Sequence, residues 1–188
     1  MRIAGFFTIF LMVASFGYAV PAPARQDNRD FAAALLSEHN SERDWLGLHP
    51  LSWSDKLAYE AWQWAEQLAK EGRMRHSTSR QRGGTGENLW AGTIGYYRIS
   101  DAVRDFIKEK QYFIPGVFPD IASTGRWQDV GHYTQIIWPE TQQVGCGMAR
   151  GRSYDFLVCR YWPAGNIIGQ RLTPQNWALD VRRQTDPQ

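Results

Sequence analysis

Residues 143–162, QVGCGMARGRSYDFLVCRYW, give the clearest indication of the fold. Two largely apolar runs, about residues 143–149 and 154–162, are joined by the polar residues 150–153, and this pattern is typical of a β-hairpin. Segments with helical periodicity lie before this hairpin, so an alternating arrangement of strands and helices around a parallel sheet is not expected. We predict an α+β fold in which helices pack on a small antiparallel sheet.

Three segments before the hairpin have the apolar spacing of amphipathic helices. The first begins at Phe31 and ends before the turn-forming sequence GLHP. Ser54 is placed to cap a second helix that closes at Gly72. Ser100 is placed to cap a third helix that runs to about Phe113.

The rest of the region up to the hairpin consists of connecting segments and two short elements. Residues 25–30 are polar, and we expect a flexible lead-in. Residues 73–86 and 114–129 are rich in polar residues, glycine or proline, so we expect two long loops. Residues 88–91 are predicted to form a short strand and residues 131–138 a short helix.

The composition fits one globular domain. The chain has 188 residues, of which 43% are hydrophobic and 14% aromatic, enough for one well-filled core. Lys and Arg number 21 against 19 Asp and Glu, which gives a formal charge of +2. So balanced a charge gives no electrostatic reason to expect a nucleic acid partner.

The first 24 residues have the layout of a secretory signal peptide. A positive start at Met1-Arg2 precedes a nearly continuous apolar run, and small residues follow it. Cleavage is expected after Ala19 or Ala24. The alternative is a membrane anchor, but a run of about 17 residues is at the lower limit for spanning a bilayer. We therefore expect a chain exported to the extracellular space or periplasm, with no membrane span after cleavage.

Cys146 and Cys159 are the two cysteines of the chain, and each lies in one strand of the predicted hairpin. An exported chain meets oxidising surroundings, which favours a disulfide. Closing a loop of this length would stabilise the fold by about 3 kcal/mol. The alternative, a catalytic thiol, is weaker because two cysteines that flank a hairpin can pair with each other.

Glu109 lies on the apolar face of the third predicted helix. Ala102, Val103, Phe106 and Phe113 mark that face, and Glu109 follows Ala102 by seven positions and precedes Phe113 by four. A buried carboxylate without a partner costs several kcal/mol, so Glu109 needs a hydrogen-bond donor or a cation. The spacing alone leaves open whether the partner has a purely structural role.

Four residues could form a metal site or an acid–base cluster if the fold brings them together. His132 opens the predicted short helix, with Gln135 on the same face, and His76 and Glu87 flank the glycine-rich end of the polar loop. Together with Glu109 they make two histidines and two glutamates, although a lone histidine is more often structural. The remaining histidines, His39 and His49, are further candidates.

The chain lacks the best-known catalytic and phosphate-binding motifs. It has no HExxH zinc-protease motif, no GxSxG nucleophile elbow, no GxxxxGK[ST] phosphate loop and no GxGxxG dinucleotide fingerprint. Aromatic and aliphatic residues crowd the segment 112–121. They could form a lipid-facing surface, but packing of these side chains onto the core is the stronger interpretation.

Six sequence motifs, taken together and in order, resemble those of one known family. They are HNSER at 39–43, His76-Ser77, GENLW at 86–90, GHYTQIIW at 131–138, VGCG at 144–147 and FLVCRYWPAGN at 156–166. This set is similar to the CAP superfamily, or SCP domain, which comprises cysteine-rich secretory, antigen 5 and pathogenesis-related class 1 proteins. The resemblance covers residues 31–170, leaves 171–188 as a C-terminal tail, and looks like a minimal single-domain member.

The resemblance implies a three-layer α–β–α sandwich with a central cleft built from His76, Glu87, Glu109 and His132. In members that bind metal, the two histidines hold zinc or a similar divalent cation, and the glutamates orient water and ligands. Two imidazoles are fewer than the three protein ligands usual in catalytic zinc sites, so a metal held by His76 and His132 would be exchangeable. Phe106 stands where the family often has tryptophan, which we interpret as a change in packing.

The sequence is compatible with three functions. The first is a secreted binding module whose cleft takes a divalent metal or small ligand, and which could also take a lipid or sterol. The second is a metal-assisted hydrolase or peptidase with Glu87 or Glu109 as general base. The third is an interaction protein in which the four residues are only structural. We rank the binding module first and the enzyme last.

Overall fold

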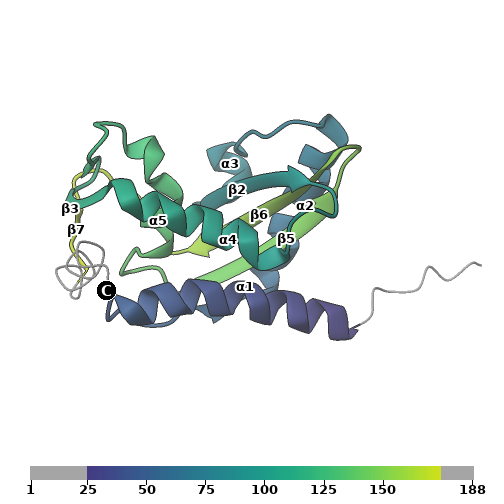
Figure 1. Cartoon of the computed structure of the whole chain (residues 1–188), viewed down its shortest axis with the longest axis horizontal. Helices are drawn as coiled ribbons and strands as arrows, with labels where there is room; N and C mark the ends of the chain where they lie inside the picture. Colours follow the sequence, from purple (N-terminus) through teal and green to yellow (C-terminus); the bar gives the residue numbers. More distant parts are fainter. Residues whose placement is uncertain (1–24, 175–188) are drawn as a thin grey trace, which may run out of the picture.

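The computed structural model describes residues 25–174, and its helices lie on both sides of a central sheet (Figure 1). The α-helices are α1 (Arg25–Trp45), α2 (Asp55–Glu71), α3 (Ser79–Arg82), α4 (Ile99–Lys108) and α5 (Gly131–Ile136). Two short 3-10 helices complete the helical part: η1 (Glu109–Tyr112) and η2 (Trp127–Asp129).

The strands form two sheets. They are β1 (Ser52–Trp53), β2 (Gly86–Thr93), β3 (Phe113–Val117), β4 (Asp120–Ala122), β5 (Gln143–Arg150), β6 (Tyr154–Trp162) and β7 (Arg171–Leu172). The main sheet has the order β1-β5-β6-β2 and is antiparallel apart from the two-residue β1, which runs parallel to β5. A smaller antiparallel sheet has the order β4-β3-β7.

The predicted hairpin is confirmed as β5 and β6, the centre of the main sheet. Cys146 lies directly opposite Cys159 in this pair, and the two form a disulfide. The described residues contain no free cysteine, so the alternative of a catalytic thiol is wrong.

One face of the main sheet is covered by α2. Gly145 and Gly147 of β5 make this close approach possible, because a Cβ at either position would lie 2.3 Å from a backbone atom of Ala58 or Trp62. The predicted ends of α2 are confirmed: Ser54 Oγ accepts a hydrogen bond from the backbone N of Leu57, and Gly72 closes the helix at a φ of 67°.

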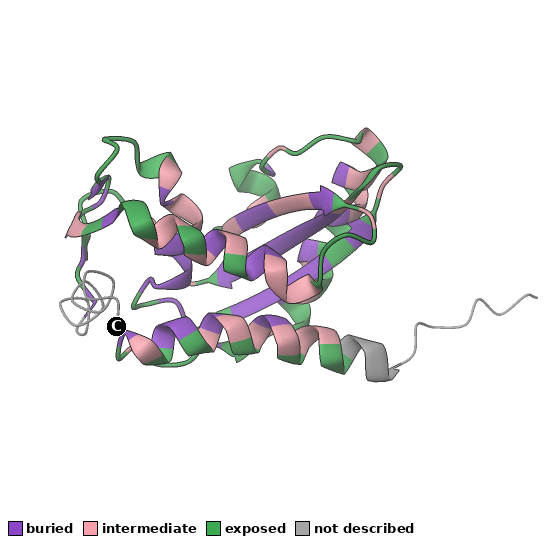
Figure 2. Cartoon of the chain, in the orientation of Figure 1, coloured by how far each residue is buried: buried purple, intermediate pink, exposed green. Residues whose placement is uncertain are grey.

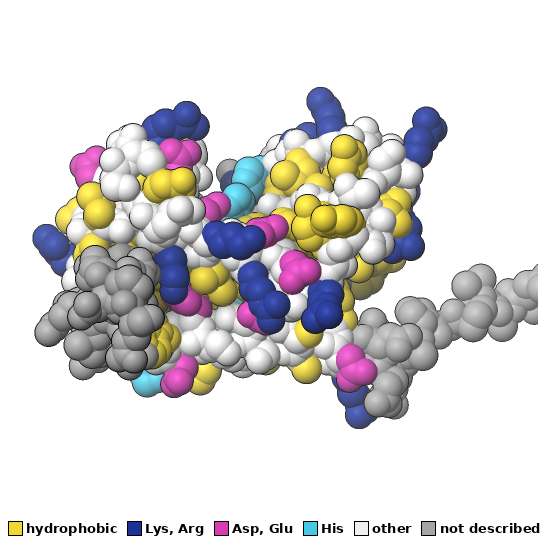
Figure 3. All heavy atoms as spheres, viewed as in Figure 1, with side chains coloured by type: hydrophobic (Ala, Val, Ile, Leu, Met, Phe, Trp, Pro, Cys, Tyr) yellow, Lys and Arg dark blue, Asp and Glu magenta, His cyan; other side chains and the backbone are white. Residues whose placement is uncertain are grey.

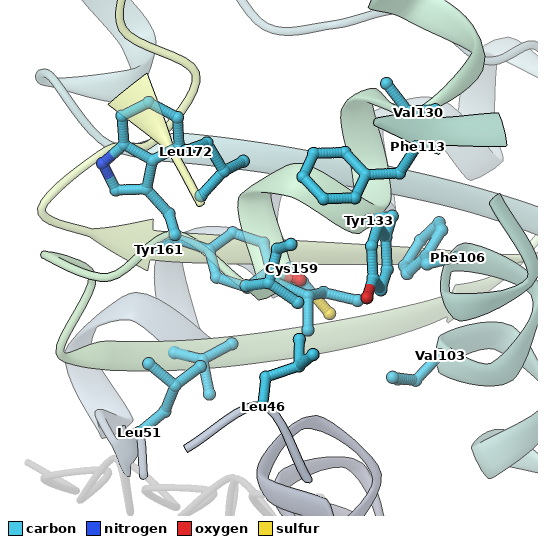
Figure 4. Close-up of a cluster of buried hydrophobic side chains, with 14 of the residues drawn as sticks. Leu46, Leu51, Val103, Phe106, Phe113, Val130, Tyr133, Cys159, Tyr161 and Leu172 are labelled. Atoms are coloured by element: carbon cyan, nitrogen blue, oxygen red, sulfur yellow. The ribbon is translucent and has the colours of Figure 1, made fainter. Parts of the chain in front are cut away.

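The opposite face of the sheet is covered by α1, α4 and α5, and the larger core cluster lies between them. In Figure 4, Leu46 directly after α1, Val103 and Phe106 of α4 and Tyr133 of α5 gather around Tyr161 of β6. Figure 2 shows the buried strands of the sheet between the partly exposed helices. The chain is therefore an α–β–α sandwich, as the resemblance implied.

Two of the predicted helices have different boundaries in the structure. Residues 25–30 were expected to be a flexible lead-in, but α1 begins at Arg25, since nothing in this polar segment breaks a helix. The third helix begins at Ile99, where an Asp101 oxygen accepts the backbone N–H of Arg98, and the α-helical part ends at Lys108. Glu109 consequently lies at the start of the 3-10 turn η1.

The two expected loops contain regular structure. Residues 114–129 include most of β3, all of β4 and η2, because β3 also pairs with the distant β7. Residues 73–86 include α3, which begins with a capping box between Thr78 and Gln81.

The signal peptide predicted at 1–24 and residues 175–188 of the predicted tail lie outside the described residues. Within residues 25–174, no helix is long and apolar enough to cross a membrane.

Candidate functional site

The first half of the site is built on β2, the edge strand of the main sheet. The Glu87 side chain is fully buried there, and its Oε1 atom lies 2.7 Å from His76 Nδ1 and accepts the backbone N–H of Ser77 at 3.0 Å. Ser77 Oγ donates to Oε2 at 2.7 Å. The His76 ring is 54% exposed, so a buried carboxylate holds a solvent-accessible imidazole.

A buried arginine stands behind Glu87. Arg160 of β6 is the cross-strand partner of Glu87, and its Nη2 atom lies 3.1 Å from Glu87 Oε2. Burial of Glu87 favours its neutral form. Hydrogen bonds from His76 and Ser77, with the charge of Arg160, outweigh that effect and hold the pKa of Glu87 below its usual range.

The second half of the site joins η1 to α5. Glu109 Oε2 accepts the backbone N–H groups of His132 at 3.0 Å and Tyr133 at 3.1 Å, and Glu109 Oε1 lies 2.6 Å from His132 Nδ1. The carboxylate thus caps the first turn of α5 as well as orienting the ring. Phe106 stacks on the His132 ring at 4.7 Å between centroids. The predicted need of Glu109 for partners is confirmed, and those partners are both structural and part of the candidate site.

Two contacts between β2 and α5 bring the halves together. Asn88, which follows Glu87, donates from Nδ2 to the His132 carbonyl at 3.0 Å. A Cβ at Gly86 would lie 2.0 Å from Gln135 Oε1, so α5 approaches this end of β2 closely. In Figure 3, histidine and acidic side chains appear together in the notch between the α3 region and the lobe that contains α5.

The hydrogen bonds fix which ring nitrogen faces outward. A carboxylate only accepts hydrogen bonds, so the Nδ1 atoms of His76 and His132 carry the protons. No residue among 25–174 hydrogen-bonds the Nε2 atom of either ring. Each half of the site therefore presents one imidazole lone pair, a donor suited to a divalent metal. The described residues form no cluster of three or more His, Cys, Asp or Glu able to hold a metal.

His39 is not part of the site. It is buried, with Nδ1 donating to the Leu35 carbonyl at 2.7 Å and Nε2 accepting from the Tyr161 hydroxyl at 2.8 Å. Burial is the main reason that the pKa of His39 falls from 6.5 to about 4. This histidine is a neutral core residue.

Gln135 also points away from the site, contrary to the expectation from its spacing. Its Oε1 accepts the backbone N–H of Gly165 and its Nε2 donates to Thr141, so it anchors the loop after β6.

The sequence analysis did not identify the roles of Ser77 and Arg160, although both residues lie inside the quoted motifs. The signal available for Arg160 was a cation within the largely apolar run 156–162.

The fold and site together define an α–β–α sandwich that is cross-linked by one disulfide and carries two His–Glu pairs at one end of its sheet. The model of the CAP family, described as the cysteine-rich secretory protein family, matches residues 36–161. The chain belongs to this family.

Plant pathogenesis-related proteins are among its relatives. The chain is 35% identical over 136 residues to pathogenesis-related protein 1C of Nicotiana tabacum, covering 72% of this chain and 76% of that protein. It is 32% identical over 166 residues to pathogenesis-related protein PRMS of Zea mays, covering 87% and 92%.

Solved structures agree on the fold. The crystal structure of NaASP2 with Zn²⁺ has a TM-score of 0.63 and 23% identity, with coverage of 76% of this chain and 84% of that one. The structure of BmVAL-1 has a TM-score of 0.62 and 24% identity, with 85% of each chain covered. At these identities the likeness supports the fold alone.

Proposed function

We propose that this CAP domain is a binding module whose His–Glu cleft takes a divalent cation, such as zinc, or a small polar ligand. One observation carries the proposal: His76 and His132 each donate Nδ1–H to a glutamate and leave Nε2 without a partner among the described residues. Histidines that bind metal almost always donate their other ring N–H to a carboxylate, a backbone carbonyl or water, and this partner fixes the tautomer and makes the ring a better donor.

The residues fit a weakly held metal better than a tightly held one. His76 and His132 would be its ligands, and Glu87 and Glu109 would orient them. A bound divalent cation would act as a Lewis acid toward a ligand in the cleft. Since the described residues supply no cluster of three ligating groups, water or the ligand itself would complete the coordination. We therefore expect exchangeable binding.

The hydrolase alternative has less support from the geometry. A general base needs a carboxylate oxygen that is free to take a proton from water or substrate. All four carboxylate oxygens of Glu87 and Glu109 already accept at least one hydrogen bond, and Glu87 is fully buried. Turnover of a peptide library that Glu109→Gln abolishes would reverse this ranking.

For a lipid ligand we propose a different place from the His76 and His132 rings. A cavity of about 460 Å³ lies between α1 and α4, and its lining combines the apolar side chains of Trp45 and Ile107 with the charged residues Glu38, Glu42, Arg104, Lys108 and Lys110. An acyl chain would pack on Trp45 and Ile107, whereas Arg104 and Lys108 are already paired with Glu38 and Asp105. Displacement of a fluorescent fatty acid, weakened in Ile107→Asp and unchanged in His132→Ala, would support this second ligand.

We also propose that the protein is exported, since the apolar start of the sequence has the layout of a signal peptide and the fold contains a disulfide. Mass spectrometry of the mature protein from the exported fraction would test this. A chain that begins after Ala19 or Ala24 supports export, and an intact N-terminus in the cytoplasm contradicts it.

Isothermal titration with zinc at pH 7.5 tests the metal proposal. The natural chain should bind, and the double variant His76→Ala/His132→Ala should not. His49→Ala is the matched control, because His49 is an exposed histidine outside the site and its loss should leave binding unchanged. Failure of the natural chain to bind, or equal binding by the double variant, contradicts the proposal. In the latter case a drop in thermal stability would favour the purely structural role.

A further inference from the structure

Arg160 is an unusual residue for a buried position in a central strand. Its side chain is 3% exposed, and its Nε atom has no hydrogen-bond partner within the described part of the chain. Nη2 lies 3.1 Å from Glu87 Oε2, and Nη1 donates to Thr85 Oγ1 at 3.3 Å. An apolar residue would cost less at such a position, since a buried guanidinium loses hydration and one of its donors remains unpaired.

The contacts of Arg160 act on the orientation of Glu87. Arg160 and Ser77 Oγ hold Oε2. Oε1 faces His76 Nδ1 at 2.7 Å and also accepts the backbone N–H of Ser77 at 3.0 Å. Arg82 is the other cation nearby, but it lies 3.8 Å from Oε1 and is partly exposed. The buried cation therefore fixes Glu87 as an ionised acceptor at a strand edge where no solvent reaches it.

We propose that Arg160 is a positioning residue of the ligand site, which holds the Glu87 carboxylate so that His76 keeps its proton on Nδ1 and presents Nε2 to the ligand. The inference rests on the proposed function for the identity of the ligand. The tautomer of His76 can be measured in the metal-free protein, so the two can fail separately.

The test is nitrogen NMR of the protein with ¹⁵N-labelled histidine, without metal and at one fixed alkaline pH. The His76 signals are assigned by their loss in His76→Gln. In the natural chain His76 should show a pyrrole-like Nδ1 and a pyridine-like Nε2. In Arg160→Met the Glu87 carboxylate loses its buried cation and keeps only the two hydrogen bonds from Ser77, so the Nε2–H tautomer should become populated, while the His132 signals stay unchanged. Zinc affinity should fall about 10- to 100-fold, as for other residues that orient metal ligands.

Two further variants make the result decisive. Arg160→Lys keeps a cation beside Glu87 and should retain the natural tautomer and zinc affinity, which keeps the inference testable if the methionine variant does not fold. Arg150→Met is the matched control, because Arg150 forms an exposed cross-strand pair with Asp155 on the same hairpin. It should leave the His76 signals unchanged.

The outcomes separate the inference from the proposed function. A folded Arg160→Met with an unchanged His76 tautomer overturns the inference, as does a folded Arg160→Lys that gains the Nε2–H form. A natural chain that shows the expected tautomer and its loss in Arg160→Met, but binds no zinc, supports the role of Arg160 and contradicts the metal site alone.

Discussion

Replacing Glu109 with glutamine separates two roles of this side chain. Its Oε2 atom accepts two backbone N–H groups from the first turn of α5, and its Oε1 atom accepts the ring proton of His132. A glutamine oxygen placed at Oε2 would keep both backbone hydrogen bonds. The amide NH₂ would then face His132 Nδ1 as a donor, and the ring could accept it only with its proton moved to Nε2.

The expected loss of stability in Glu109→Gln is about 1–2 kcal/mol, because a charged acceptor near a helix N-terminus becomes neutral while the cap persists. Glu109→Ala should lose more, about 2–4 kcal/mol, since two backbone N–H groups and the ring lose their acceptor. Urea unfolding followed by tryptophan fluorescence measures both.

Zinc affinity tests the second role of Glu109, which is to orient the His132 ring. Glu109→Gln should weaken zinc by about 10- to 100-fold, since the protonated Nε2 can no longer act as a ligand. Titration calorimetry on the folded variant gives this value. The reasoning fails if Glu109→Gln binds zinc as tightly as the natural chain, or if it is destabilised as much as Glu109→Ala.

Two further predictions concern the scaffold. His39 has a pKa of about 4 in the fold against 6.5 ordinarily, so its contribution to stability is complete above pH 6.5 and is lost as the pH falls toward 4, by about 3 kcal/mol. Urea unfolding at pH 7.5 and 4.5 should therefore show a smaller drop in His39→Gln than in the natural chain, and equal drops would show that another group is responsible. Gly145→Ala should destabilise the fold by about 1–3 kcal/mol, because its Cβ would lie 2.3 Å from the backbone N of Ala58 in α2. Thermal unfolding measures this, and an unchanged midpoint would mean that α2 can move away without cost.

The parts of the fold that were predictable are those with local signals. Two apolar runs joined by a polar turn indicated the β5–β6 hairpin, and the caps at Ser54 and Gly72 indicated α2 to within a residue. The pairing of Cys146 with Cys159 followed from their places on that hairpin. For the site, periodicity selected Glu109, and residue type and position made His76, Glu87 and His132 candidates. The expectation that the four meet in one cleft came from the family resemblance alone.

The parts that were not predictable depend on contacts between distant segments. The strands within 114–129 pair partly with residues 171–172, which no local pattern relates to them. The role of Arg160 depends on the register of β2 against β6, which places it opposite Glu87. Gln135 shares a helical face with His132 by spacing, but the loop at Gly165 draws its side chain away.

The central claim is that His76 and His132 bind one ligand together through their Nε2 atoms. Zinc titration of the ¹⁵N-histidine-labelled natural chain at pH 7.5 tests this most directly. The Nε2 signals of both rings should shift together, with Nδ1–H retained on each, while the buried His39 stays unchanged. A shift at only one of the two rings, or at His49 alone, would contradict the account.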